Sequence, residues 1–259
     1  MPEVLLYWKP PRLININQKL LFIIYDIIFK SLNNQIVEKK TPELFDLEKV
    51  RSIYPPTDYN ESMNTVLVQE LIRCNRLLAR MVDSLKDLKL AIKGEIVMSD
   101  DLEAIANSFY ILQVPEEWEY PLGFLSLKSL NSWVEELNQR VNFFNTWIKE
   151  GQPNAFWMSG FFFPQSFITG TLQNYARRNK ISIDQIGFEY EVLESNKTLE
   201  TIRERPDSGV YVYGIYLEGA RWDEYKRQLA HSNPKELYSS LPMMHLKTTN
   251  NREQPVSDT

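Results

Sequence analysis

The fold depends on residues 154–178, NAFWMSGFFFPQSFITGTLQNYARR, where aromatic side chains crowd around a short turn. Two aromatic residues, ending at Trp157, precede a serine–glycine turn that ends at Gly160, and three phenylalanines follow, ending at Phe163. Burying the side group of one phenylalanine stabilises a fold by roughly 1.5–3 kcal/mol, and so large a cluster left in water would promote aggregation. We therefore predict a buried turn or strand that leads, at Pro164, into a helix with apolar spacing.

The composition bounds the class of protein. The 259 residues suffice for one large domain or two small ones, and 43% of them are hydrophobic. The net charge of −5 argues against a nucleic-acid or anionic-membrane partner, because phosphate binding needs clustered lysine and arginine. The only cysteine, Cys74, excludes an internal disulfide and a multi-cysteine metal site, which is typical of a reducing, intracellular compartment.

Residues 1–56 read as an atypical leader segment, because proline and asparagine interrupt every long element in them. Their apolar run, residues 20–29, is shorter than the roughly 20 residues of a membrane-spanning helix and contains Asp26. A short buried helix or a non-native leader therefore explains the run better than a membrane or targeting role does.

Residues 57–153 are predicted to form a helical subdomain. Apolar residues step by four and three from Leu67 to Ile92, which predicts one long helix, with Gly94 as its C-terminal cap. Cys74 lies on this apolar stripe and is more plausibly a small core residue than a nucleophile. Charged residues, Glu70 among them, fill the other faces of the helix.

Two further helices and a loop complete this subdomain. Ser99 is placed to cap a short helix, and residues 127–149 repeat the heptad spacing, so that the long helices pack antiparallel. The loop at residues 116–120 is interpreted as a solvated loop anchored by Trp118, with a recognition loop as the alternative.

The strand-rich part is predicted to follow the aromatic hinge and its helix, residues 154–180. Residues 181–194 alternate as a strand does, and residues 209–220 are rich in β-forming residues, with Gly214 indicating a bulge. The apolar run at residues 238–246 contains Pro242, which limits it to an edge strand or an extended arm. We expect residues 181–247 to form a β-barrel-like subdomain and residues 248–259 a disordered tail.

The sequence contains no phosphate-binding loop, no dinucleotide fingerprint and no nucleophile elbow. Glu189 and Glu191 alternate with aromatic residues on one strand, and an acid–base pair there would make a hydrolase. A solvated strand face explains them better. The basic residues Arg177, Arg178 and Lys180 suit caps and surface pairs at a helix C-terminus rather than a nucleic-acid patch.

Several long motifs in fixed order resemble the C-terminal domain of dynein heavy chains, most closely those of axonemal, single-headed inner-arm dyneins. They are FWMSGFFFPQSFITGTLQNYARR, ISIDQIGFEYEV, GVYVYGIYLEGARWD and PKELYSSLPMMHLK, and the resemblance covers about residues 64–247. It implies an α+β fold in which an antiparallel helical part precedes an antiparallel barrel-like part. The motif positions then become structural residues, with no catalytic, cofactor-binding or metal-binding residue among them: Trp157, Gly160, Phe163, Pro164, Gly170, Gly187, Gly209, Gly219, Trp222, Pro234 and Pro242.

The resemblance also implies a role in ciliary motility. The parent protein is an ATPase motor that moves along microtubules and uses ATP and Mg, whereas this domain is non-catalytic and braces the ATPase ring. The implied partners are the ring modules in cis and, through the parent complex, intermediate or light chains and microtubules. The implied location is the cytoplasm and cytoskeleton of the ciliary axoneme, and neither nucleic acid nor membrane is implied as a partner.

Two features depart from the family pattern. Residues 1–50 do not resemble the ring module that precedes this domain in the family, and the family continues with further closing strands where this chain reads NNREQPVSDT. We therefore expect a truncated isoform or fragment, whose barrel has an open edge. The alternative function is a free-standing protein-binding module that docks a peptide or an axonemal partner.

Overall fold

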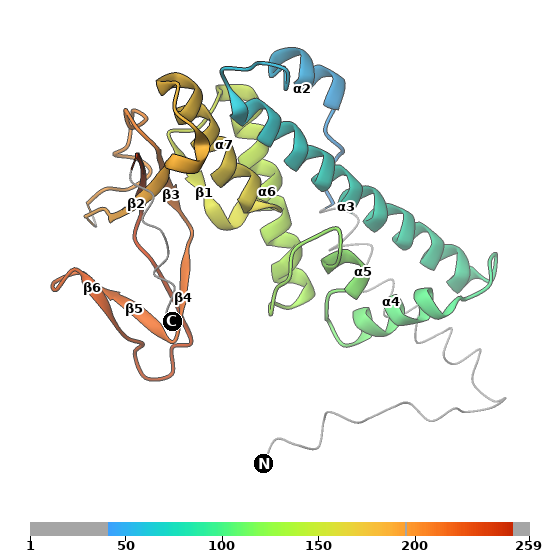
Figure 1. Ribbon diagram of the computed structural model, residues 1–259. Helices are drawn as coiled ribbons and strands as arrows, with labels where there is room; N and C mark the ends of the chain where they lie inside the picture. Colours follow the sequence, from blue (N-terminus) through green and yellow to red (C-terminus); the bar gives the residue numbers. More distant parts are fainter. Residues whose placement is uncertain (1–40, 195, 251–259) are drawn as a thin grey trace, which may run out of the picture.

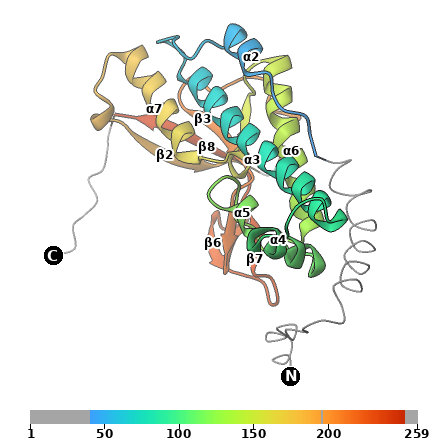
Figure 2. The same ribbon diagram turned by 90° about the vertical axis from the view of Figure 1, so that its right-hand side faces the viewer.

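The computed structural model describes residues 41–194 and 196–250 and divides into a helical part and a strand-rich part (Figure 1). A long helix, α3, runs along the helical part, and α7 lies over the four-stranded sheet (Figure 2). The helices are α2 (Leu47–Ile53), α3 (Ser62–Lys93), α4 (Asp100–Tyr110), α5 (Glu116–Glu119), α6 (Leu130–Glu150) and α7 (Pro164–Asn179), with 3-10 turns at Met158–Gly160 and Ile183–Gln185. The strands are β1 (Ala155–Trp157), β2 (Gly187–Val192), β3 (Val210–Tyr213), β4 (Tyr216–Glu218), β5 (Ala220–Asp223), β6 (Gln228–His231), β7 (Tyr238–Ser240) and β8 (Met244–Thr249).

The predicted long helix is confirmed as α3. Its heptad stripe is buried from Leu67 to Leu88, Leu71 and Cys74 included, and Ile92 at the end of the stripe is partly buried. Gly94 ends the helix in the left-handed conformation, with φ 78° and its N–H donating to the carbonyls of Leu90 and Ala91. The burial of Cys74 raises the pKa of its thiol to about 12, so the thiol stays protonated and unreactive.

The other helices of this part also follow local signals. The Ser99 hydroxyl accepts a hydrogen bond from the Leu102 N–H at 3.3 Å, as expected of an N-cap. The expected loop at residues 116–120 contains one helical turn, α5, and its Trp118 is fully buried, donating its Nε1–H to the Ser84 hydroxyl at 3.0 Å. α6 begins three residues later than predicted, so that Leu127 lies outside it and is exposed.

The strand-rich part is not the predicted antiparallel barrel. Its main sheet has the order β1-β3-β8-β2, in which β1 and β3 are parallel and the other pairs antiparallel. Two separate two-stranded sheets, β4–β7 and β5–β6, complete it, and the described strands do not close into a barrel. The α+β class and the order of a helical part before a strand-rich part are confirmed.

Two strand predictions need correction. Gly214 is no bulge: at φ 75° it ends β3 and directs the backbone into β4, which belongs to another sheet. The run around Pro242 is no single edge strand either, because it splits into β7 and β8, and β8 lies in the middle of the main sheet. Pro242 falls in the connection between them, where its missing N–H removes no ladder hydrogen bond.

The ends of the described region differ from the predicted leader and tail. Part of residues 1–56 forms α2, whose Val50 is buried in the core shared with Leu67 and Phe156; residues 1–40 lie outside the described part. β8 extends two residues into the predicted tail, and Thr248 is buried there. The tail from residue 251 also lies outside the described residues.

The aromatic hinge is largely core. Phe156, Phe161 and Phe167 are buried, and the rings of Phe161 and Phe167 stack with centroids 4.8 Å apart. Phe163 is 40% exposed and Trp157 only partly buried, so burial does not extend to every ring of the predicted cluster. The buried rings contact both α3 and the sheet, so the hinge joins the two parts of the fold.

A matched pair of substitutions tests this assignment. Phe167→Ala should lower the free energy of unfolding by about 3–5 kcal/mol, because it leaves a cavity in the core, whereas Phe163→Ala should cost less than about 1.5 kcal/mol. Chemical denaturation of both variants measures the difference. Equal losses at the two positions would contradict the assignment of the hinge to the core.

Candidate functional site

The candidate catalytic residues do not form an active site. Glu189 and Glu191 are exposed on β2, and Nδ1 of the His245 ring lies 3.9 Å from Oε2 of Glu191. In the described part of the sequence, no three His, Cys, Asp or Glu side chains are grouped as metal ligands. None of the described helices has the length and apolar character to cross a membrane.

The most unusual polar group of the fold is Glu70 of α3. Its carboxylate is fully buried and accepts hydrogen bonds from the Phe162 N–H at 2.6 Å and the Phe163 N–H at 3.0 Å. Phe163 is the N-cap of α7, where backbone N–H groups lack intrahelical acceptors and the helix dipole favours negative charge. Glu70 therefore joins α3 to the start of α7.

A buried arginine contacts the same segment from the other side. Arg140 of α6 is 3% exposed, donates to the Phe161 carbonyl at 3.3 Å and forms a 2.7 Å salt bridge with Glu136. Its guanidinium also lies 3.7 Å from the centroid of the Phe124 ring. We call the hydrogen bonds of Glu70 and Arg140 to the backbone of residues 161–163 the hinge contacts.

The prediction that placed Glu70 on a charged face of the helix, away from the apolar stripe, is wrong because Glu70 is buried, and the sequence patterns assigned Arg140 no role. One signal was available: Glu70 sits three residues after Leu67 and one before Leu71, at the border of the apolar stripe. Burial raises the pKa of Glu70 to about 7, although the two N–H donors and the nearby Arg73 and Arg140 oppose the rise.

This pKa gives the protein a pH-dependent stability. Because the folded-state pKa lies above the ordinary value of 4.5, the folded state binds more protons, and stability falls as pH rises from about 4.5 to about 7. Glu70→Gln keeps an acceptor and removes the titration. The unfolding free energy of the wild type relative to Glu70→Gln should drop by about 3 kcal/mol between pH 4 and pH 8. Parallel pH profiles of the two proteins would contradict this reading.

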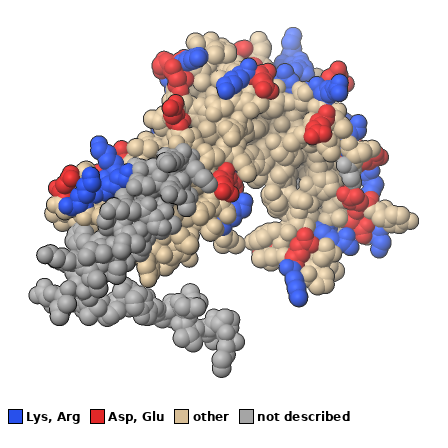
Figure 3. All heavy atoms as spheres, turned by 180° about the vertical axis from the view of Figure 1, so that it is seen from behind, with Lys and Arg blue, Asp and Glu red and all other residues tan. Residues whose placement is uncertain are grey.

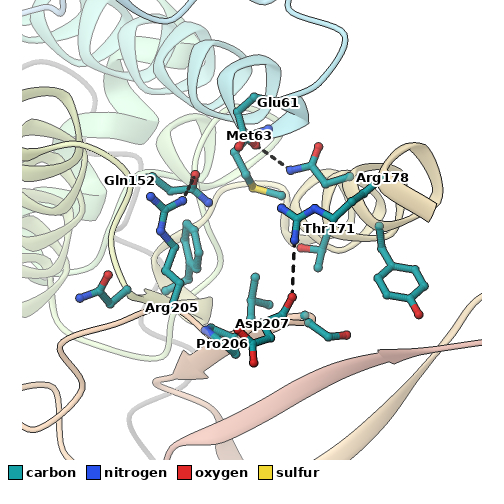
Figure 4. A pocket seen from close by; sticks show the side chains of 15 residues that line it. Glu61, Met63, Gln152, Thr171, Arg178, Arg205, Pro206 and Asp207 are labelled. Carbon is teal, nitrogen blue, oxygen red and sulfur yellow. Dashed lines mark hydrogen bonds between the residues drawn. The ribbon is translucent and has the colours of Figure 1, made fainter. Parts of the chain in front are cut away.

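A polar cavity of about 230 Å³ lies at the seam between the helical part and the sheet (Figure 4). Arg178 of α7 and Arg205 of the segment before β3 enter it from different walls; Arg178 donates to the Asp207 carbonyl at 3.5 Å and Arg205 to the Gln152 amide at 2.7 Å. Glu61, at the start of α3, accepts from an asparagine of α7 in the same cavity. The polar side chains of this cavity therefore bind one another and hold the helical part to the segment before β3.

The neighbouring Arg177 follows the prediction for a surface pair. Its guanidinium donates to the Tyr59 carbonyl at 2.7 Å and to the Ser62 hydroxyl at 2.8 Å, and it lies 4.4 Å from the Tyr59 ring centroid. These contacts attach the C-terminal half of α7 to the start of α3.

A second, larger groove of about 680 Å³ runs between α6, β1 and the segment at residues 199–202. Its aromatic lining consists of Phe143, Trp157 and Tyr213, and among the described residues that line it Glu150 alone is charged. The partial exposure of Trp157 arises because its ring forms one wall of this groove. The groove thus combines aromatic rings with uncharged polar side chains such as Gln139 and Asn142, a lining suited to a protein or peptide contact, and the described residues bring no converging acid–base groups into it.

Three of the motif glycines lie where a side chain would meet neighbouring atoms. A Cβ on Gly170 would lie 3.0 Å from a methyl of Val66, so this glycine sets the approach of α7 to α3, and a Cβ on Gly160 would overlap the Trp157 ring. Gly209, at φ 77°, lies so close to β8 that a Cβ would be 1.8 Å from the Leu246 carbonyl oxygen. The others lie at element boundaries or on strands: Pro164 at the first turn of α7, Gly187 at the start of β2, Gly219 before β5, Trp222 on β5, Pro234 before β7 and Pro242 before β8.

Two glycines with nearly equal φ separate backbone strain from steric overlap. Gly94→Ala adds a Cβ in open space at φ 78°, so it should cost only the left-handed strain of about 1–2 kcal/mol. Gly209→Ala meets the β8 backbone as well, and its loss of unfolding free energy should be at least about twice as large. Thermal and chemical denaturation measure the loss of unfolding free energy in both variants. Similar losses would contradict the prediction, because β8 would then move away from the added Cβ without a loss of stability.

Charged side chains are interspersed on the face shown in Figure 3, where lysine and arginine lie beside aspartate and glutamate over a largely uncharged surface. Outside the grey atoms, this face shows no continuous basic field of the kind that phosphate backbones require.

Comparisons with known proteins identify the family of this chain. The family model for the C-terminal domain of the dynein heavy chain matches residues 25–259. The chain is 51% identical over 219 residues to rat dynein axonemal heavy chain 1, an alignment that covers 85% of this sequence and 5% of that protein. It is 49% identical over 216 residues to mouse dynein axonemal heavy chain 3 and 43% identical over 227 residues to human dynein axonemal heavy chain 12.

The protein thus belongs to the family of C-terminal domains of dynein heavy chains. It spans only 5–7% of the length of these relatives. The family is a non-ATPase part of an ATPase motor, and the described residues show no catalytic site.

Proposed function

We propose that this protein acts as the non-catalytic C-terminal region of an axonemal dynein heavy chain, bracing the ATPase ring and tuning the force of a microtubule minus-end-directed motor. The observation that carries the proposal is the family match over most of the sequence, together with about 50% identity to axonemal heavy chains. ATP and Mg belong to the parent motor in this proposal. The ciliary axoneme is its location, and the ring modules are its direct partners.

The geometry supports a bracing role in two ways. The two buried charged side chains of the described residues, Glu70 and Arg140, make structural hydrogen bonds to the protein's own backbone. Both halves of the fold share one core, in which Leu71 of α3 and Val212 of β3 belong to the same cluster. A domain built in this way transmits a load between its halves without a flexible linker.

The proposal predicts binding to a dynein ring that lacks its own C-terminal domain. The purified protein should bind such a ring fragment and restore its stall force in a single-molecule trap, and it should hydrolyse no ATP by itself. Phe163→Ala is a suitable control, because Phe163 is partly exposed and its loss should leave the fold intact. ATP turnover by the isolated protein, or failure to bind the ring, would contradict the proposal.

The groove beside Trp157 favours a second candidate, a free-standing module that docks a peptide or an axonemal partner. The two candidates differ in their binding partner. A protein that binds no ring fragment but loses an axonemal partner on Trp157→Ala would support the module instead of the brace.

A further inference from the structure

β2 is an edge strand of the four-stranded sheet, so some of its backbone N–H and C=O groups point toward β8 and the others point away from the sheet. Beyond the end of the strand, the Leu193 N–H donates to the Met243 carbonyl at 2.9 Å and continues the ladder with β8. Hydrogen-bonded pairs alternate with unbonded pairs in an antiparallel ladder. Counting back from Leu193, the backbone groups of Glu191 and Glu189 point toward β8.

The remaining backbone groups of β2, those of Phe188, Tyr190 and Val192, therefore point away from the sheet. One contact verifies this direction: the Arg227 guanidinium donates to the Val192 carbonyl at 2.8 Å from the outer side. Tyr190 is 69% exposed. Across residues 41–194 and 196–250, no strand pairs with this edge, and the backbone groups of Phe188 and Tyr190 on it have no hydrogen-bond partner.

An open edge of six residues is a template for another strand, and proteins usually protect such edges. Here Arg227 covers one end only. The face that carries Glu189 and Glu191 has basic neighbours on the β8 side, Lys247 and His245, which are their cross-strand partners. On the side opposite to β8, no described strand lies beside Glu189 and Glu191.

The charges decide which strand fits. A second copy of the protein, paired antiparallel about Tyr190, would set Glu189 opposite Glu191 of that copy, and directly opposed like charges are destabilising. A strand with lysine or arginine at these positions would instead form cross-strand ion pairs. Its alternate side chains would lie on the face of Phe188 and Tyr190, where apolar residues extend the sheet surface.

We propose that the outer edge of β2 binds an extended segment of a partner protein in which basic and apolar residues alternate, so that the segment adds a fifth strand to the sheet. Main-chain hydrogen bonds to Phe188 and Tyr190 supply affinity, and Glu189 and Glu191 supply selectivity for basic side chains.

The first test uses the protein of 259 residues and a fluorescent peptide of about seven alternating lysine and valine residues, with a glutamate–valine peptide as the control. Fluorescence anisotropy should show binding of the lysine peptide, at least about tenfold tighter than that of the glutamate peptide. Charge reversal in Glu189→Lys with Glu191→Lys should invert the preference. Absence of binding, or equal binding of both peptides, would overturn the proposal.

The second test separates strand addition from simple charge attraction. Tyr190→Pro removes an N–H that faces away from β8, so it should preserve the sheet and weaken lysine-peptide binding at least about tenfold. Tyr190→Ala, which keeps the N–H, should stay within about threefold of the wild type. Unchanged binding by Tyr190→Pro would show that charge alone attracts the peptide and would overturn the proposal.

Amide hydrogen exchange of the wild type tests strand addition at β2 without relying on a variant that has to fold. Added lysine peptide should slow exchange of the Phe188 and Tyr190 amides and leave those of Glu189 and Glu191 unchanged, because these already bond to β8. Unprotected Phe188 and Tyr190 amides would overturn the proposal. A dimer in light scattering that Tyr190→Pro dissociates would also overturn it, since the occupant would then be a second copy.

Discussion

The hydrogen bonds from the Phe162 and Phe163 N–H groups to the buried Glu70 carboxylate fix where the aromatic hinge meets α3. These N–H groups belong to the N-cap residue of α7 and to the residue before it, so the carboxylate acts as a cap supplied by another helix. Leaving a buried charge without its partners costs about 3–5 kcal/mol, so registers of α7 along α3 that separate Glu70 from these donors are disfavoured. The Glu70 carboxylate thus sets the position of α7 and of the backbone segment that leads into it.

The rest of the packing follows from that position. With residues 161–163 held by Glu70 on one side and Arg140 on the other, the Phe161 ring stacks on Phe167, and both lie in the core that also contains Val212 of the sheet. Gly170, one turn further along α7, permits the close approach to α3 that this arrangement requires. Polar contacts fix the geometry, and apolar burial supplies most of the stability.

Local signals in the sequence were enough for α3, for the Ser99 cap and for the buried hinge, because periodicity, capping chemistry and aromatic density act over a few residues. They could not reveal the role of Glu70, whose donors lie 92 and 93 residues away. Strand pairing was equally out of reach: a parallel β1–β3 pair and a central β8 are set by tertiary packing, which the alternation of side chains does not encode.

The arrangement limits where a function can lie. The buried Cys74 thiol is protonated, and the buried side chains of Glu70 and Arg140 bind backbone groups of the hinge. Two features of the described surface can contact other molecules. The groove beside Trp157 offers a shaped surface, and the outer edge of β2 offers unpaired backbone hydrogen-bonding groups. The groove lies against α6 and β1, and β2 ends the same sheet, so ligands at the two places would act on one rigid core from different sides.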